Sequence, residues 1–211
     1  GERREQVVAA VAEAHDAFVE AAIQARELVA VARVIDDAPR DVVLPGGRTY
    51  YSLWDLAAEG VEGGDTIEAD TSDPARIPAW VMDGAIIPVL ASSDTPVFGE
   101  PLFVSQSTIW IVPGRDASLT AYTEAEEPFD VSLEAADGSD VVSLSTVPET
   151  TFLRIRFDAD GDAPTVQGDA TEADSLDALE GAGDAYFVDE EAGAVVVRFD
   201  AGGAKSVTVV H

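Results

Sequence analysis

Residues 40–90 read RDVVLPGGRTYYSLWDLAAEGVEGGDTIEADTSDPARIPAWVMDGAIIPVL, and this segment carries the clearest structural pattern in the chain. Short apolar or aromatic runs, such as residues 41–44 and 49–56, alternate with glycine and proline turn signals. The turn signals are Pro45-Gly46-Gly47, Gly63-Gly64 and Asp83-Gly84. Short strands separated by such turns are typical of an antiparallel β-domain.

The order of these pieces resembles the β-domain that follows the catalytic barrel in family 31 glycoside hydrolases, the α-glucosidase and α-xylosidase group. The family pattern is an arginine-initiated strand ending in Leu-Pro-x-Gly, an aromatic strand, a Gly-Gly turn, and an Ile-Pro strand leading to Gly-x-Ile-Ile-Pro. This sequence supplies the parts in that order as RDVVLPGG, YYSLW, GG, IPAWV and GAIIP, at residues 40–47, 50–54, 63–64, 77–81 and 84–88. The region from residue 153 onwards is similar in its order of elements to the family's last domain.

The sequence departs from the family where the catalytic carboxylates would stand. In the family they lie in an upstream barrel, which takes about 250 residues, whereas 39 residues precede Arg40 here. The resemblance therefore implies a non-catalytic accessory β-region that braces or completes a carbohydrate-active enzyme, with no catalytic residue and no cofactor of its own. Two alternatives stay open: a free-standing carbohydrate-binding module, and an interaction protein with no sugar role.

The charge balance is strongly acidic: 41 acidic residues stand against 12 basic ones, for a net charge of −29 over 211 residues. Acids spread along the chain, with Lys205 as the one lysine, are typical of proteins from molar salt, where self-repulsion is screened within about 3 Å. We therefore expect a halophilic, archaeal protein in a high-salt cytoplasm; an acidic mesophilic protein and an extracellular location stay open. The charge disfavours nucleic acid and anionic membranes as partners.

The pattern as a whole predicts a mainly β fold, with two antiparallel β-sandwich domains preceded by an N-terminal α-helix. The expected parts are the helix over residues 1–26, a proximal sandwich over 27–123 and a distal sandwich over 124–211. Apolar residues at three- and four-residue spacing give the helix one apolar stripe. The stripe consists of Val7, Val11, Ala14, Phe18 and Ala22. We expect it to lie in an interface, within a homodimer or a hetero-complex with a catalytic barrel subunit.

In the distal part the period of two is clear. Leu153, Ile155 and Phe157 are expected on one face of a strand, with Arg154 and Arg156 on the other. Residues 175–179 predict a short helical link between strands.

Aromatic residues could form a platform that stacks on sugar rings, and we take Tyr50, Tyr51 and Trp110 as the candidates for carbohydrate contact. Tyr50 and Tyr51 point to opposite faces of one strand, so at least one is expected to be exposed. For Trp54 and Trp80 a place in the core is favoured.

Asp158, Asp160 and Asp162 have the spacing of the start of a calcium loop, and are the candidate metal ligands. The sixth and twelfth positions of the loop hold Ala163 and Asp169 instead of glycine and glutamate, so an incidental acidic run is the alternative. The sequence contains no cysteine, which excludes disulfides and thiolate metal sites.

Overall fold

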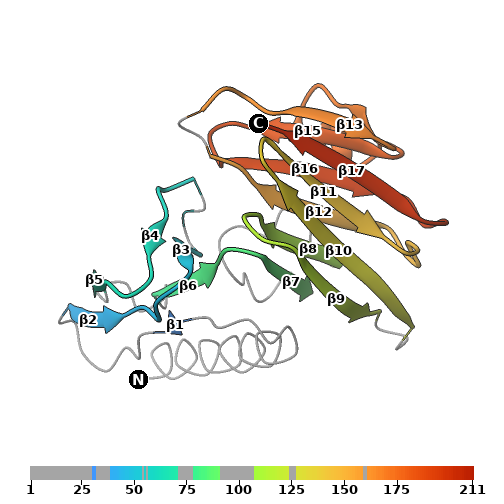
Figure 1. The fold of residues 1–211 in the computed structure, drawn as a ribbon. Helices are drawn as coiled ribbons and strands as arrows, with labels where there is room; N and C mark the ends of the chain where they lie inside the picture. Colours follow the sequence, from blue (N-terminus) through green and yellow to red (C-terminus); the bar gives the residue numbers. More distant parts are fainter. Residues whose placement is uncertain are drawn as a thin grey trace, which may run out of the picture.

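The protein is mainly β in the part of the chain that the computed structural model describes, which is residues 30–31, 39–53, 55, 57–70, 78–90, 107–123, 127–158 and 161–211 (Figure 1). The helix described there is α2 (Leu176–Leu179), capped by the Ser175 side chain, which accepts a hydrogen bond from Ala178 N at 3.2 Å. This confirms the predicted link. Within these ranges no helix has the length and hydropathy to cross a membrane. The predicted helix over residues 1–26 and its apolar stripe lie outside the described residues.

The first part of the chain forms two small sheets. A four-stranded sheet has the order β1-β6-β3-β4, and a two-stranded ribbon pairs β2 with β5. The strands are β1 (Ala30–Val31), β2 (Arg40–Val43), β3 (Thr49–Ser52), β4 (Val61–Glu62), β5 (Thr66–Ala69) and β6 (Ala79–Met82). The strand predicted over residues 49–56 is shorter than expected, because the chain turns after Ser52, whose carbonyl oxygen accepts the backbone N–H of Asp55 at 3.3 Å.

Two larger sheets follow. A six-stranded sheet has the order β14-β15-β16-β12-β8-β7, and a five-stranded sheet has the order β13-β17-β11-β10-β9. The first contains β7 (Ala85–Leu90), β8 (Ser107–Val112), β12 (Thr151–Arg156), β14 (Thr171–Glu172), β15 (Ala185–Asp189) and β16 (Ala194–Phe199). The second contains β9 (Ala117–Tyr122), β10 (Pro128–Ala136), β11 (Ser139–Leu144), β13 (Thr165–Gly168) and β17 (Lys205–Val210).

Most strand pairs are antiparallel, as the sequence predicts, but two pairs are parallel: β8 with β12, and β14 with β15. The physical reason for the first is the connection. Between β8 and β12 the chain passes through β9, β10 and β11 of the other sheet, and such a crossover allows a parallel return. The alternation of turns along the sequence carries no information about this long-range pairing.

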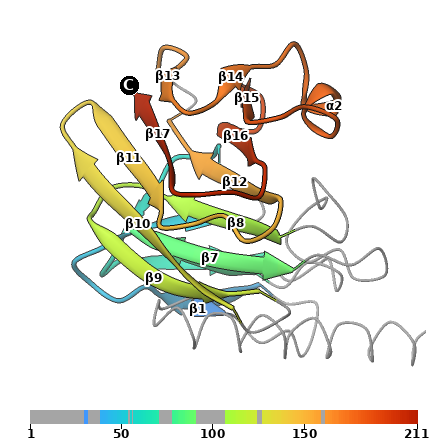
Figure 2. The same ribbon diagram turned by 90° about the vertical axis from the view of Figure 1, so that its right-hand side faces the viewer.

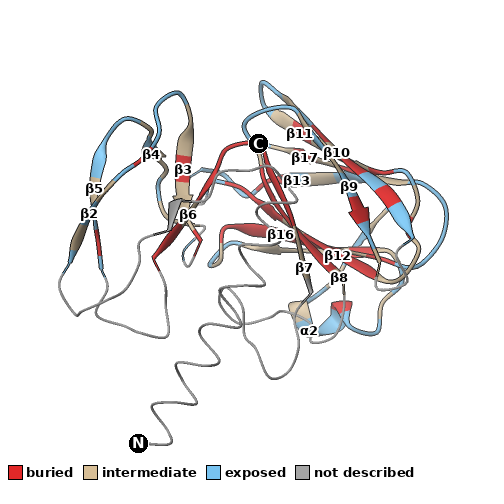
Figure 3. Ribbon diagram, turned by 90° about the horizontal axis from the view of Figure 1, so that it is seen from below, coloured by how far each residue is buried: buried red, intermediate tan, exposed pale blue. Residues whose placement is uncertain are grey.

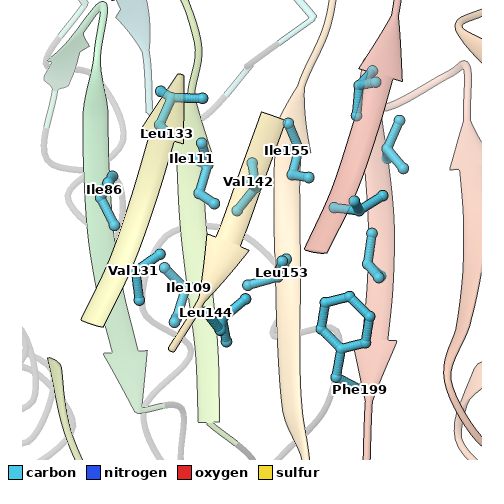
Figure 4. Packing of buried hydrophobic residues seen from close by; sticks show 14 of the residues in the cluster. Ile86, Ile109, Ile111, Val131, Leu133, Val142, Leu144, Leu153, Ile155 and Phe199 are labelled. Atoms are coloured by element: carbon cyan, nitrogen blue, oxygen red, sulfur yellow. The ribbon is translucent and has the colours of Figure 1, made fainter. Parts of the chain in front are cut away.

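The two large sheets share one apolar core (Figure 4). Ile109, Ile111 and Leu153 come from the six-stranded sheet, whereas Val131 and Leu144 come from the five-stranded sheet. Figure 2 shows β9, β10 and β11 lying over β7, β8 and β12, in agreement with this common core. The predicted alternation in β12 is confirmed, because Leu153 and Ile155 enter the core while Arg154 and Arg156 leave the opposite face.

The two sheets differ in how their outer faces are covered, and the sequence shows why. In β10, buried and exposed residues alternate, so one face meets water. In β7 and β8, the runs AIIPVL and STIWIV are nearly continuous in apolar residues, which suits strands covered on both faces. Figure 3 shows this difference as mostly buried strands β8, β12 and β16 beside more exposed segments of the five-stranded sheet.

The turn at Asp83-Gly84 joins the two parts of the molecule. β6 ends in the four-stranded sheet and β7 begins the six-stranded sheet, with only these two residues between them. Gly84 has φ of +78°, a conformation that suits glycine. Strands on both sides of residue 123 combine in each large sheet, so the strand pairing crosses the predicted boundary there. The division into three parts remains a prediction.

Candidate functional site

The junction between the four-stranded and six-stranded sheets is the candidate functional site, because it gathers arginines and aromatic rings on a face that is otherwise apolar. Its base is a cluster that includes Leu53 and Val81 from the first part and Ile87, Trp110 and Val112 from the second. Alternation along β7 and β8 places these side chains on the outer face, away from the main core.

Arg156 and Tyr51 form the first arginine–aromatic pair across this junction. The Arg156 guanidinium lies 3.8 Å from the centroid of the Tyr51 ring and donates a hydrogen bond to Ala58 O at 3.3 Å. Arg156 is only 8% exposed. Burial lowers the pKa of Arg156 and raises the pKa of Tyr51, while each group partly offsets the shift of the other. The pair therefore holds β12 against the loop that follows β3.

Arg154 and Trp110 form the second pair, two residues back along β12. The Arg154 guanidinium lies 5.4 Å from the Trp110 ring centroid, within the range of a cation–π contact. Burial lowers the pKa of Arg154, and the negative charge of Asp189 acts in the opposite direction. Unlike Arg156, Arg154 has its Nε buried without a hydrogen-bond partner.

A carboxylate joins the same two parts at the β6–β7 turn. Asp83, 8% exposed, accepts from Arg115 Nε at 2.9 Å and from Arg48 Nη1 at 3.3 Å. Arg115 also donates to Gly47 O at 2.8 Å. Arg48 belongs to the first part of the chain and Arg115 to the β8–β9 turn, so one carboxylate connects three separate turns.

The residues predicted to contact carbohydrate are found in and around the junction. Tyr50 is 1% exposed and packs with Leu44 and Met82, and its burial raises its pKa. Trp110 is 5% exposed, whereas Tyr51 is half-buried beneath Arg156. The burial of Tyr50 and Trp110 favours packing over sugar contact, and contact itself stays a prediction.

Of the two tryptophans expected in the core, the structure describes one. Trp80 is half-buried and packs beside the Leu44–Tyr50–Met82 cluster, while Trp54 lies outside the described residues.

The predicted metal ligands are only partly described. Asp158 and Asp162 are exposed, and Asp160 lies outside the described residues. Over the described ranges, no three acidic or histidine side chains come close enough to hold a metal ion. The calcium hypothesis therefore stays a prediction that rests on spacing alone.

Sequence reasoning placed Arg154 and Arg156 on the correct face but missed their aromatic partners, as well as Arg48, Asp83 and Arg115. The signal that was available is the pair of arginines on an otherwise apolar strand, since a buried charge requires a partner. The identity of that partner depends on contacts far apart in sequence, such as those between Arg156 and residues 51 and 58.

Comparison with known proteins rests on structure, since no protein-family model and no curated protein matches the sequence. A cycloalternan-forming enzyme from Listeria monocytogenes, solved with a pentasaccharide substrate, is 21% identical, with a TM-score of 0.69; the match covers 86% of this chain and 18% of the enzyme. A family 31 glycoside hydrolase dextranase from Flavobacterium johnsoniae, solved with glucose, is 17% identical, with a TM-score of 0.67. This match covers 87% of this chain and 26% of the dextranase.

This chain shares its fold with part of family 31 glycoside hydrolases. An α-1,4-glucan lyase from Gracilariopsis lemaneiformis gives the same result, at 17% identity and a TM-score of 0.60, with 86% of this chain and 22% of the lyase covered. The chain thus spans about a fifth to a quarter of the length of these three enzymes. The resemblance predicted from the sequence is confirmed at the level of the fold.

Proposed function

We propose that this chain is a non-catalytic accessory β-region of a family 31-like glycoside hydrolase, which braces or completes the barrel that carries the chemistry. The observation that supports this most is the coverage: 86% of the chain overlays on 18% of a cycloalternan-forming enzyme. In this proposal the full arrangement is a helix over residues 1–26 followed by two β-sandwiches. The helix stripe and the first small sheets face the barrel.

The junction supports a bracing role, because a supporting domain must keep its own parts in a fixed arrangement. The Arg156–Tyr51 pair, the Asp83 carboxylate and the apolar cluster beneath them together hold the small sheets to the large ones. Such fixed contacts suit a rigid support better than a surface that opens for a ligand. The carbohydrate-binding alternative has less support, since Tyr122, 63% exposed, is the one clearly exposed aromatic residue in the described ranges.

The direct test is to co-express the chain with a family 31 barrel polypeptide of the same genome, in molar salt. We expect the barrel to gain soluble yield and to melt at a higher temperature, because burial of a shared apolar face stabilises the bound state. A barrel with the same yield, melting temperature and activity with or without this chain would contradict the bracing role.

We predict that the chain by itself does not cleave α- or β-nitrophenyl glycosides. The reason is that no pair of carboxylates with an acid and a nucleophile role was found in the sequence. The measurement is release of nitrophenol in about 1 M salt, the regime in which charge repulsion is screened. Turnover that disappears when an acidic residue of this chain is mutated would overturn the prediction.

A second prediction concerns the partner. We propose that the helix stripe lies in a homodimer or a hetero-complex, in a high-salt archaeal cytoplasm, since an exposed apolar stripe is uncommon on a monomer and molar salt strengthens apolar association. Phe18→Glu should dissociate the complex, because it places an unpaired carboxylate in the interface. The readout is molar mass by light scattering in molar salt.

Ala9→Glu is the matched control, since the predicted helix would place position 9 opposite Phe18 and the added charge is identical. We expect it to leave the mass unchanged. The stripe has no partner if the unmodified protein is a monomer and if Phe18→Glu changes neither its molar mass nor its stability.

A further inference from the structure

The outer face of the six-stranded sheet concentrates positive charge in a chain that has little of it. Arg154 and Arg156 on β12 and Arg198 on β16 leave the same face, opposite the side chains that enter the main core. These are three of the 12 basic residues of a chain with a net charge of −29. A cluster of this kind on a mostly buried face requires acceptors, because a guanidinium stays charged and offers five N–H donors.

Two of the three arginines have acceptors within the chain. Arg198 donates to the backbone oxygens of Ala182 and Gly183, the second at 2.9 Å, and forms an ion pair with Asp200 at 2.7 Å. Arg156 donates to Ala58 O. Both guanidinium groups are therefore held in place by oxygen atoms of neighbouring turns.

Arg154 lies in the register between them and has no such acceptor. Its Nε is buried without a partner, as is the Nε of Arg198. Unlike Arg198, however, Arg154 makes no hydrogen bond or ion pair through the rest of its guanidinium within the described part of the chain. Asp189 influences it only through its charge, and an Asp189 oxygen already accepts the backbone N–H of Ala192 at 3.0 Å. A buried guanidinium without an oxygen acceptor is costly, whereas the same group with a carboxylate is well satisfied.

The strand register shows what surrounds Arg154. The row across the sheet consists of Ile87, Trp110, Arg154, Val196 and Phe187. Arg154 and Phe187 are half-buried, while the other three are buried. Part of the Arg154 residue is therefore exposed, and apolar side chains flank it on both sides. Such walls exclude water and strengthen a bidentate contact with a planar anion.

We propose that Arg154 is the recognition residue of a carboxylate-binding site on the outer face of the six-stranded sheet, between the loop after β3 and helix α2. The fork of the guanidinium matches the two oxygens of a carboxylate. A free small carboxylate and an aspartate or glutamate side chain of a second copy of this chain present the same group. The site does not depend on the accessory role proposed above.

The test compares melting temperatures of the full chain in sodium acetate and in sodium chloride, each at about 1 M, so that screening is equal. In the unmodified protein we expect acetate to raise the melting temperature by about 3–5 °C more than it does in Arg154→Met, the shift that a tenfold excess over Kd produces in a chain of this size. The general effect of acetate on apolar burial appears in both proteins and cancels. Equal acetate responses in the two proteins would overturn the proposal.

Arg198→Met is the matched control, because it removes an arginine of the same face whose acceptors lie within the chain. We expect it to melt lower in both salts and to keep the extra response to acetate. If Arg154→Met fails to fold, the Nε–H signals of the arginines in the unmodified protein give a second readout by NMR. The Arg154 signal is assigned by its loss in Arg154→Lys. Its chemical shift should change saturably as acetate is added. A chemical shift that does not change with acetate at any protein concentration would overturn the proposal.

The source of the carboxylate is resolved by dilution in chloride. An Arg154 signal that moves with protein concentration, together with a doubled mass by light scattering, would assign the carboxylate to a second copy. A signal that responds to acetate but not to dilution would assign it to a small free carboxylate. Each result supports the site and identifies its ligand.

Discussion

Transfer from molar KCl to about 0.01 M salt should unfold this protein or lower its melting temperature by tens of degrees. At about 0.01 M the Debye length is near 30 Å, so nearly all surface charges repel one another, whereas at 1 M it is near 3 Å. A net charge of −29 over 211 residues makes that repulsion large. The described ion pairs of basic residues offset only a few of the acids.

Circular dichroism during stepwise dialysis measures the effect. Sucrose in place of salt is the control, because it favours compact states by exclusion but does not screen charge. If charge repulsion is the cause, sucrose in dilute buffer should restore little of the lost signal. Equal melting temperatures in dilute buffer and in molar KCl would show that the chain is acidic without depending on salt.

Asp83→Ala should destabilise the fold by about 2 kcal/mol, which corresponds to a fall in melting temperature of about 4–8 °C for a chain of this length. The substitution removes the acceptor shared by Arg48 and Arg115 and leaves both arginines facing a small void at the β6–β7 turn. The estimate lies below the range for fully buried pairs because the two arginine side chains are 34% and 51% exposed.

Glu134→Ala removes the same charge from an exposed position on β10 and serves as the control. We expect its effect to stay within about 0.5 kcal/mol. Asp83→Asn, which keeps the shape and one acceptor oxygen, should fall between the two. Thermal melts of all three in molar salt test the idea, and an Asp83→Ala protein that melts with the Glu134→Ala protein would mean that the carboxylate contributes little.

The sequence predicts this fold where a signal is local. Turn residues such as Asp83-Gly84 and the alternation of Leu153 with Arg154 are properties of a few neighbouring residues, and both agree with the structure. The short helix after Ser175 is predicted for the same reason, because its cap lies within three residues.

The prediction weakens where pairing is long-range. The parallel contact of β8 with β12 joins residues 107–111 to residues 151–155, and β17 pairs with β11 across all of residues 145–204. Chain patterns alone do not specify which strands meet. The Arg156–Tyr51 pair follows the same rule, since Arg156 lies in the six-stranded sheet and Tyr51 in the four-stranded sheet. Arg154 and Trp110 meet through the β8–β12 pairing itself.

The candidate site shows the same limit more sharply. Tyr50 and Trp110 look suited to a sugar platform in sequence, yet the sheet packing buries both, because each points toward a neighbouring layer and not toward water. An aromatic residue on a strand is compatible with either a covered or an exposed face of the sheet, so its sequence position alone does not show which face it occupies. By contrast, an arginine without an oxygen acceptor on such a face becomes informative only when its surroundings are known.

The position of β17 in the five-stranded sheet has a consequence for synthesis on the ribosome. β17 lies between β13 and β11, so β13 has no neighbour in the sheet, and β11 has β10 alone, until residues 205–210 have emerged. A nascent chain that stops at residue 200 would therefore display an open sheet edge and part of an uncovered core, the features that chaperones bind and proteases cut. Chaperones and proteases should therefore act on the nascent chain until β17 pairs, and chaperone binding should end when the sheet closes.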